Sequence, residues 1–169
     1  MKFSVFFSNL FQNKIFALIL LILCTAFIFL NSLTSAEQSS SQSAVVVDRV
    51  VEILNEVGVK ANEETVVKVI RKTAHFSEFF ALGAVCYYFR YLISKHPYKL
   101  SVNFILYGVI TALTDETLQY TSLGRSPEIL DVWIDVSGFL VSFSAMLFVF
   151  TFIYFKLNSN NKLKDSQQF

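Results

Sequence analysis

Ionisable residues recur at three-residue steps inside a segment that is otherwise rich in apolar residues. Lys72, His75 and Glu78 follow one another in this way, so on a helix they cover an arc of about 120° on one side. An imidazole donates or accepts a proton near neutral pH, and a neighbouring carboxylate such as Glu78 would tune its titration. The spacing predicts a helix face for acid–base chemistry, with His75 and Glu78 as candidate catalytic residues.

Carboxylates in two later segments complete the candidate catalytic set: Asp115, Glu116, Asp131 and Asp135. The first two project within about 100° of Gln119 on one predicted helix. The other two belong to a stripe that continues through Gly138 and Ser142, small residues that permit close helix contact. Such carboxylates can supply a base or bind a hard divalent cation through oxygen. Carboxylates with one histidine do not specify an ion, so metal and cofactor stay open.

Arg125 lies in a polar turn before the last apolar run. Ser126 is predicted to cap the following helix, with Pro127 at its first position. Free N–H groups at a helix start beside a guanidinium suit an anion. The same turn also suits an ordinary capped loop whose arginine pairs with Asp131 or Glu128. The candidate substrate- or anion-binding residues are Lys72, Gln119 and Arg125.

The composition places these groups in a membrane protein. The chain has 169 residues, of which 54% are hydrophobic, 16% are charged and 19 are Phe, and its mean hydropathy is +0.52. Soluble domains carry about 25% charged residues. This composition excludes a disulfide scaffold, a collagen-like repeat, a disordered tail and a basic nucleic-acid-binding protein. The sequence predicts an integral membrane protein with the lipid bilayer as its partner and no nucleic-acid partner; its oligomeric state stays open.

Four apolar segments have the length of about 20 residues that a transmembrane helix needs. They cover residues 15–33, 73–94, 100–119 and 132–155. We therefore expect an all-α polytopic fold, with one domain at 1–155 and a polar cytoplasmic tail at 156–169. With the N-terminus in the cytoplasm, the inner segments hold eight Lys or Arg and one acid, as the positive-inside rule favours. Both termini are then cytoplasmic. Alternatively, the first span is a signal peptide cleaved before Glu37, since small residues precede that position.

The segment between the first two spans is expected on the outer face. Residues 37–43 are expected to form a Ser/Gln-rich linker. Apolar and polar residues then alternate with helical period over 44–57, which predicts an amphipathic helix. Gly58 is expected to end this helix, and Asn62 to cap a second helix that continues into span two. The outer helical segment therefore covers residues 44–72.

The depth of the charges indicates where they meet. Glu78 and Arg90 are twelve residues apart, or about 18 Å on a helix, so a hydrocarbon core of about 30 Å cannot fit between them. Glu78 is therefore expected at membrane depth, with His75 one turn further out. Ionisable groups there cost about 2.5–3.5 kcal/mol each and face the bundle or a wet cavity. We expect the candidates to converge at the outer leaflet; the structural alternative is an ion-pair network that joins the helices.

These residues resemble the VanZ-like family of membrane proteins. The matching motifs are Lys72-x-x-His75-Phe76-x-Glu78 followed by Leu82-Gly83, Asp115-Glu116-x-x-Gln119, Gly124-Arg125, and Asp131-x-x-x-Asp135-x-x-Gly138. The resemblance extends from Ile15 to Phe155 and includes the Ser-containing stretch 32–43. It implies a multi-pass protein of the bacterial cell membrane that is linked to teicoplanin resistance. It does not supply a reaction.

Three functions agree with this pattern. The first is an enzyme that acts at the outer leaflet on a lipid-linked or cell-wall precursor, although the chain has no nucleophile elbow, P-loop or zinc-protease motif. The second is a non-catalytic binding or scaffold protein whose polar cluster is structural. The third is a small proton-coupled transporter, which is disfavoured because the inner halves of the first and fourth spans lack charged residues.

Overall fold

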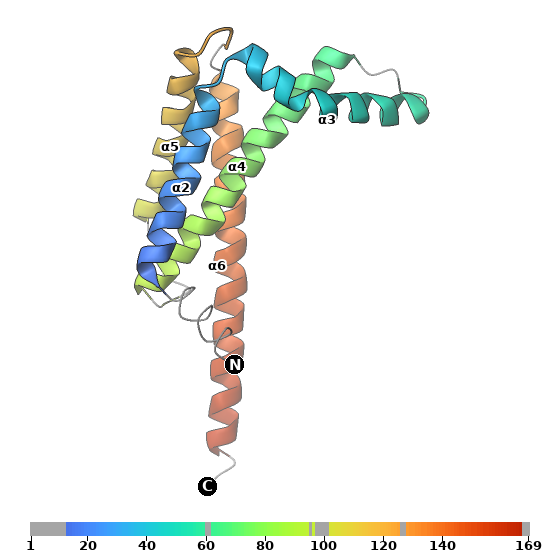
Figure 1. Ribbon diagram of the computed structural model, residues 1–169. Helices are drawn as coiled ribbons and strands as arrows, with labels where there is room; N and C mark the ends of the chain where they lie inside the picture. Colours follow the sequence, from blue (N-terminus) through green and yellow to red (C-terminus); the bar gives the residue numbers. More distant parts are fainter. Residues whose placement is uncertain (1–12, 60–61, 95, 97–101, 126–127, 167–169) are drawn as a thin grey trace, which may run out of the picture.

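A computed structural model of the chain describes residues 13–59, 62–94, 96, 102–125 and 128–166. Within these residues the structure has five helices and no strand, which confirms the all-α prediction. The helices are α2 (Lys14–Ser32), α3 (Ala36–Glu56), α4 (Glu63–Ser94), α5 (Val102–Tyr120) and α6 (Ile129–Ser166). Helices α2, α4, α5 and α6 run side by side, and α3 extends from one end of this bundle (Figure 1).

The helix starts follow local capping. The Asn13 side chain accepts a hydrogen bond from Ile15 N at 2.8 Å and begins α2. As predicted, Asn62 does the same for α4, accepting from Glu64 N at 3.0 Å, and α4 then continues for 32 residues to Ser94. Gly58 has a φ of 80°, a left-handed conformation that favours glycine and ends a helix. The predicted helix end at Gly58 and the predicted helix start at Asn62 are therefore confirmed.

The predicted linker at residues 37–43 is wrong, because α3 already begins at Ala36. Ser35 accepts a hydrogen bond from Gln38 N at 3.2 Å, and Glu37 lies in the first turn, where a negative charge is favourable. The Ser41 and Ser43 hydroxyls donate to backbone carbonyls of the preceding turn. Polar composition predicted a linker, but these serines satisfy their hydrogen bonds within a helix.

The C-terminal segment also differs from a simple polar tail. Helix α6 continues past residue 155 to Ser166. No Pro or Gly follows Gly138 in this helix, so nothing in the local sequence interrupts it. Figure 1 shows this end of α6 projecting beyond the other helices, at the same end of the bundle as the start of α2.

Two of the described helical segments, Lys14–Ser32 and Ile129–Ser159, are long and apolar enough to cross a membrane. Helix α2 exposes large apolar side chains along its length, including Ile19, Ile22 and Leu23, as a lipid-facing helix does. Helices α4 and α5, which are the predicted second and third spans, are not among these two segments. The four-span topology therefore stays a prediction.

Glycines set the close packing of α4 against α6. A Cβ atom at Gly83 would meet the backbone oxygen of Phe139, and a Cβ atom at Gly138 would meet the backbone oxygen of Phe76. The two helix backbones can approach this closely only because neither glycine has a side chain. This contact fixes the register that brings Asp135, one turn before Gly138, to the level of α4 where His75 lies.

Candidate functional site

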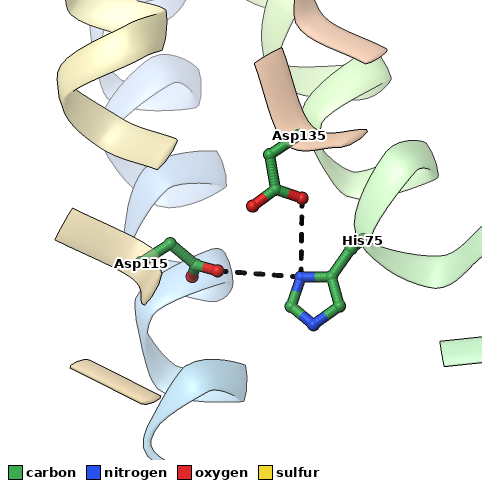
Figure 2. A group of neighbouring side chains, drawn as sticks. All are labelled: His75, Asp115 and Asp135. Atoms are coloured by element: carbon green, nitrogen blue, oxygen red, sulfur yellow. Dashed lines mark ion pairs between the residues drawn. The ribbon is translucent and has the colours of Figure 1, made fainter. Parts of the chain in front are cut away.

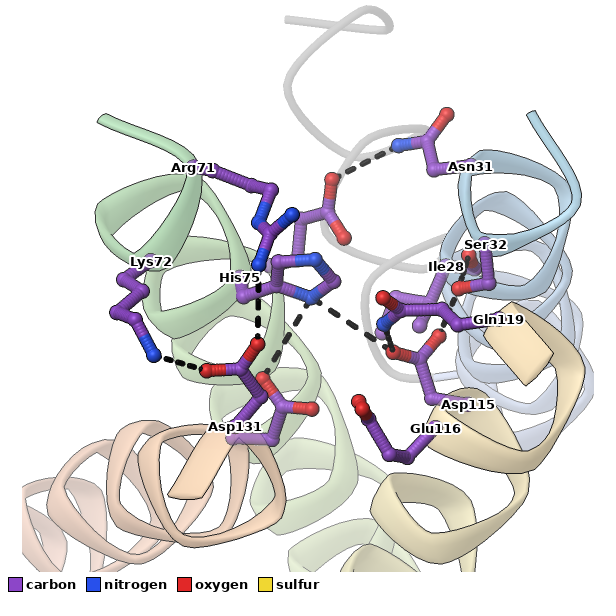
Figure 3. A network of polar contacts seen from close by, with 12 residues as sticks. Ile28, Asn31, Ser32, Arg71, Lys72, His75, Asp115, Glu116, Gln119 and Asp131 are labelled. Carbon is purple, nitrogen blue, oxygen red and sulfur yellow. Dashed lines mark hydrogen bonds and ion pairs between the residues drawn. The ribbon is translucent and has the colours of Figure 1, made fainter. Parts of the chain in front are cut away.

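Polar side chains of four helices meet near the end of the bundle from which α3 extends (Figures 1 and 3). They are Asn31 and Ser32 of α2, Arg71, Lys72, His75 and Glu78 of α4, Asp115, Glu116 and Gln119 of α5, and Asp131 and Asp135 of α6. Arg125 joins them from the loop between α5 and α6. The structure therefore brings the candidates of both predicted sets to one end of the bundle.

His75 lies between two carboxylates (Figure 2). Its Nδ1 atom is 3.6 Å from Asp115 Oδ2 and 3.7 Å from Asp135 Oδ1. His75 is 8% exposed and both aspartates are fully buried. Each separation is longer than an ordinary N–H···O hydrogen bond, whose upper limit is about 3.2 Å. The imidazole thus lies between two buried acids without a hydrogen bond to either.

Asp115 is held by two further side chains. Ser32 Oγ donates to its Oδ1 atom, and Gln119 Nε2 donates to Oδ2 at 3.1 Å. Gln119 is only 2% exposed, and its side-chain amide orients the Asp115 carboxylate. The sequence indicated an anion-binding role for Gln119, but its side chain contacts Asp115.

Glu78 and Glu116 also have specific partners. Glu78 Oε1 accepts a hydrogen bond from Asn31 Nδ2 at 2.8 Å. Glu116 Oε1 accepts one from the backbone N–H of Glu128 at 2.5 Å, which ties the end of α5 to the start of α6. Glu78 was expected to tune His75, but in the described residues the carboxylates within 4 Å of the imidazole belong to other helices.

An ion-pair group joins α4 to α6 beside the histidine (Figure 3). Lys72 Nζ lies 2.5 Å from Asp131 Oδ1 and 3.2 Å from Glu128 Oε2, and Arg71 Nη2 lies 3.5 Å from Asp131 Oδ2. The hydrogen bond with Asp131 raises the pKa of Lys72 above its usual value. Lys72 was predicted to bind an anion, and in the structure it pairs with two carboxylates of the protein.

Arg125 has a different partner from the acids that the capped-loop alternative assigned to it. Its Nη2 atom donates to Thr34 Oγ1 at 3.0 Å. The alternative in which Arg125 pairs with Asp131 or Glu128 is not seen, because Lys72 pairs with both acids. Burial is the main cause that lowers the pKa of the Arg125 guanidinium, followed by the nearby positive charge of Arg71. The predicted cap at residues 126–127 lies outside the described residues.

The loop around Arg125 is attached to the end of α2. Ser122 Oγ donates to the backbone oxygen of Ser32 at 2.8 Å, and Ala36 N donates to the backbone oxygen of Leu123 at 3.1 Å. Gly124 has a φ of 75°, which favours glycine in the tight turn before Arg125. These contacts position the guanidinium over the gap between α2 and α4.

A cavity of about 490 Å³ opens at this gap. Its polar lining includes Asn31, Thr34, Arg71, His75, Glu78 and Arg125, and its apolar lining includes Phe27, Val67 and Ile70. The four aspartate and glutamate candidates of α5 and α6 are not among its lining residues. The site therefore has two layers: a cavity wall with two arginines, and a buried acidic group behind His75.

Four residues of this site were absent from the sequence-based candidates: Asn31, Ser32, Thr34 and Arg71. The sequence contains a weak indication of each of these residues. The first three are polar residues at the end of an apolar helix, and Arg71 precedes Lys72 in a segment already selected. Their contacts depend on how α2 packs against α4 and α5, which helical spacing within one segment does not report.

Comparison with known proteins agrees with the motif resemblance. The VanZ/LLP1 family model matches residues 16–152, a range that contains every candidate site residue. No curated protein and no solved structure matches the chain in the corresponding searches. The family match and the two apolar helices identify a membrane protein. Because the matched range covers most of the sequence, the chain belongs to the VanZ/LLP1 family.

Proposed function

We propose that this protein binds the anionic headgroup of a lipid-linked or cell-wall precursor at the outer leaflet of the bacterial cell membrane. In this proposal α2, α4, α5 and α6 are the four spans, both termini are cytoplasmic, and the cavity beside α3 faces outward. Capture or modification of such a precursor would link the protein to glycopeptide resistance, including teicoplanin resistance.

The observation that carries the proposal is the pair of arginines that line the cavity. Arg71 and Arg125 both line the cavity. The Nε atom of Arg71 is buried and has no hydrogen-bond partner within the described part of the chain. Guanidinium groups bind phosphate or carboxylate through two parallel N–H donors, which gives both affinity and orientation. Two such groups in one cavity favour an anionic ligand.

The rest of the cavity suits the lipid part of the same ligand. Phe27, Val67 and Ile70 supply apolar walls, and α2 exposes apolar side chains along its outer surface. A volume of about 490 Å³ lies in the range of small-molecule sites, about 300–1,000 Å³. A charged headgroup can thus lie at the arginines while an attached chain runs along apolar surface.

His75 and Glu78 supply the chemistry of an enzymatic form of this function. Both line the cavity, so a bound headgroup would lie beside an imidazole and a carboxylate that can exchange protons with it. In this form Asp115 and Asp135 orient and charge-balance His75 from behind. A binding protein would need the arginines but not this proton transfer.

A scaffold function is the second candidate, and the ion pairs favour it. Arg71 and Lys72 join Asp131 across α4 and α6, and Asp131 is 2% exposed. A network of this kind can hold the helices together without any ligand. It predicts that the cavity arginines affect stability but not lipid binding.

The deciding experiment measures lipids that co-purify with the full chain extracted in native nanodiscs. We expect Arg125→Gln to reduce bound anionic lipid by about ten-fold or more, because a hydrogen bond to a charged group contributes about 1.5–3 kcal/mol. The matched control is Arg49→Gln, an exposed arginine of α3 whose Nη1 pairs with Glu52 at 2.7 Å. Equal lipid content in both variants and the wild type would reject the binding proposal in favour of the scaffold.

A second experiment separates enzyme from binding protein. Envelope lipids and teicoplanin susceptibility are compared in a deletion strain complemented with wild-type protein, His75→Ala or Glu78→Gln. An enzyme predicts accumulation of one precursor with both variants, while lipid co-purification is retained. A binding protein predicts that these variants complement as well as the wild type does.

A further inference from the structure

The acidic group behind the cavity has the composition of a metal site. His75 Nδ1, a carboxylate oxygen of Asp115 and one of Asp135 all lie within 4.8 Å of one another (Figure 2). The histidine nitrogen is 3.6 Å and 3.7 Å from the two oxygens. Around a tetrahedral ion with bonds of about 2.0–2.2 Å, neighbouring ligand atoms lie about 3.3–3.6 Å apart. The observed separations are too long for hydrogen bonds and close to those of ligands that share an ion.

An unsatisfied buried carboxylate points to a ligand at the same place. Asp135 is fully buried, and within the described residues neither of its side-chain oxygens has a hydrogen-bond partner. The Nδ1 atom of His75, which faces this carboxylate, also lacks one. Buried polar atoms are nearly always paired in folded proteins, so the unpaired His75 Nδ1 and the unpaired Asp135 Oδ1 that lies 3.7 Å from it need a further binding partner.

The charges of the neighbourhood call for a cation. Asp115 and Asp135 are buried next to one imidazole, and among the described side chains no Lys or Arg lies within 4 Å of either carboxylate. The nearby cations are used elsewhere: Lys72 and Arg71 pair with Asp131. Burying unpaired carboxylates in a low-dielectric interior is costly. A divalent ion between them would supply the missing positive charge.

We propose that His75, Asp115 and Asp135 bind a divalent transition-metal ion of the Zn²⁺ or Mn²⁺ type. An imidazole nitrogen favours such ions over Ca²⁺ and Mg²⁺, whereas the two carboxylates are compatible with either. Ser32 and Gln119 hydrogen-bond Asp115, as outer partners commonly orient metal-binding carboxylates. The proposal concerns occupancy of this group and does not rest on the anionic ligand of the cavity.

Three protein ligands leave a coordination position open to water or to a bound molecule. His75 belongs both to this group and to the cavity lining. The ion would therefore lie next to the space assigned to the headgroup. Metal content and lipid binding are separable measurements on the same protein.

The test loads the purified full chain with Zn²⁺ or Mn²⁺ after chelation, removes free ion, and measures metal per chain and affinity. We expect about one ion per chain and, for Asp135→Asn and His75→Gln, affinity that is weaker by about 100-fold or more, since even outer partners of a metal cost about 10- to 100-fold. Glu116→Gln is the matched control, because it removes a buried carboxylate adjacent to Asp115 that is not in the triad.

The outcomes are distinct. A wild-type chain that retains no ion, or Asp135→Asn with wild-type affinity, would overturn the proposal, as would binding of Mg²⁺ in preference to Zn²⁺ and Mn²⁺. If Asp135→Asn does not fold, the thermal midpoint of the wild type decides: it should rise with metal and fall with chelator, and no change would overturn the site. Arg125→Gln should lose lipid but keep its metal, so the two proposals fail independently.

Discussion

The glycine contact between α4 and α6 allows a test of how the bundle positions the site. In Gly138→Ala, the new Cβ atom would lie 3.2 Å from the carbonyl carbon of Phe76 and 3.3 Å from its Cα atom, with the backbone oxygen closer still. Carbon atoms in comfortable contact lie about 3.5–4.0 Å apart. The obstruction is helix backbone, which cannot rotate away as a side chain can. The helices must therefore separate locally.

Two effects of opposite sign determine how much Gly138→Ala changes the free energy of unfolding. Overpacking costs about 1–3 kcal/mol, whereas alanine is favoured over glycine within a helix by about 1 kcal/mol. Because the obstruction is helix backbone, the overpacking cost should lie in the upper part of its range, about 2–3 kcal/mol, so we expect a net loss of about 1–2 kcal/mol in the free energy of unfolding. Because Phe76 follows His75 and Asp135 lies one turn before Gly138, the same displacement should lengthen the His75–Asp135 separation of 3.7 Å.

The assay is reversible unfolding of the purified chain in mixed micelles, followed by circular dichroism. Ser137→Ala is the control, since Ser137 is the exposed neighbour of Gly138 on α6 and should change stability by less than about 0.5 kcal/mol. Gly83→Ala should behave like Gly138→Ala, because its Cβ atom would meet the backbone of Phe139. If both glycine variants are as stable as the wild type, the close helix approach described above is refuted.

Three further substitutions test other contacts. Lys72→Met removes the amine 2.5 Å from the buried Asp131 carboxylate and should lower the free energy of unfolding by about 1–3 kcal/mol. The control Lys68→Met breaks only the exposed pair with Glu64 and should cost less than about 1 kcal/mol in the same assay. Equal effects of the two substitutions would contradict this reasoning. Asn31→Ala leaves Glu78 without its 2.8 Å hydrogen bond, so hydrogen exchange should quicken in the last turn of α2; unchanged exchange there would argue against the contact. Ser35→Ala removes the cap of α3 and should cost about 1 kcal/mol of local helix stability, seen as faster exchange over residues 37–43; exchange that is already unprotected in the wild type would restore the linker prediction.

Several features could be predicted because they depend on local sequence. Helical periodicity predicted a helix that carries Lys72, His75 and Glu78, and α4 contains all three. Apolar length predicted the segments that form α2 and α6, and both contain stretches long and apolar enough to cross a membrane. Asn62 and Gly58 were identified as a cap and a terminator by residue type alone, and both assignments are confirmed. The motifs also indicated the family that the comparison confirmed.

Local signals were misleading where composition and hydrogen bonding disagree. The serines of residues 37–43 indicated a linker by their polarity, yet a cap at Ser35 and backbone hydrogen bonds keep the segment helical. Polarity reports solvent contact, whereas helix formation depends on capping and on the absence of helix-breaking residues.

Helix faces and residue types along each segment thus predicted that the candidate residues meet at one level of the bundle. These are properties that residues near in sequence share. Only the packing of the helices decided that Asp115 and Asp135 flank His75, and that Arg125 reaches Thr34 while Lys72 takes Asp131. Pairing across helices depends on their mutual rotation and register. Those are set by backbone contacts at Gly83 and Gly138, between residues more than fifty positions apart in the chain.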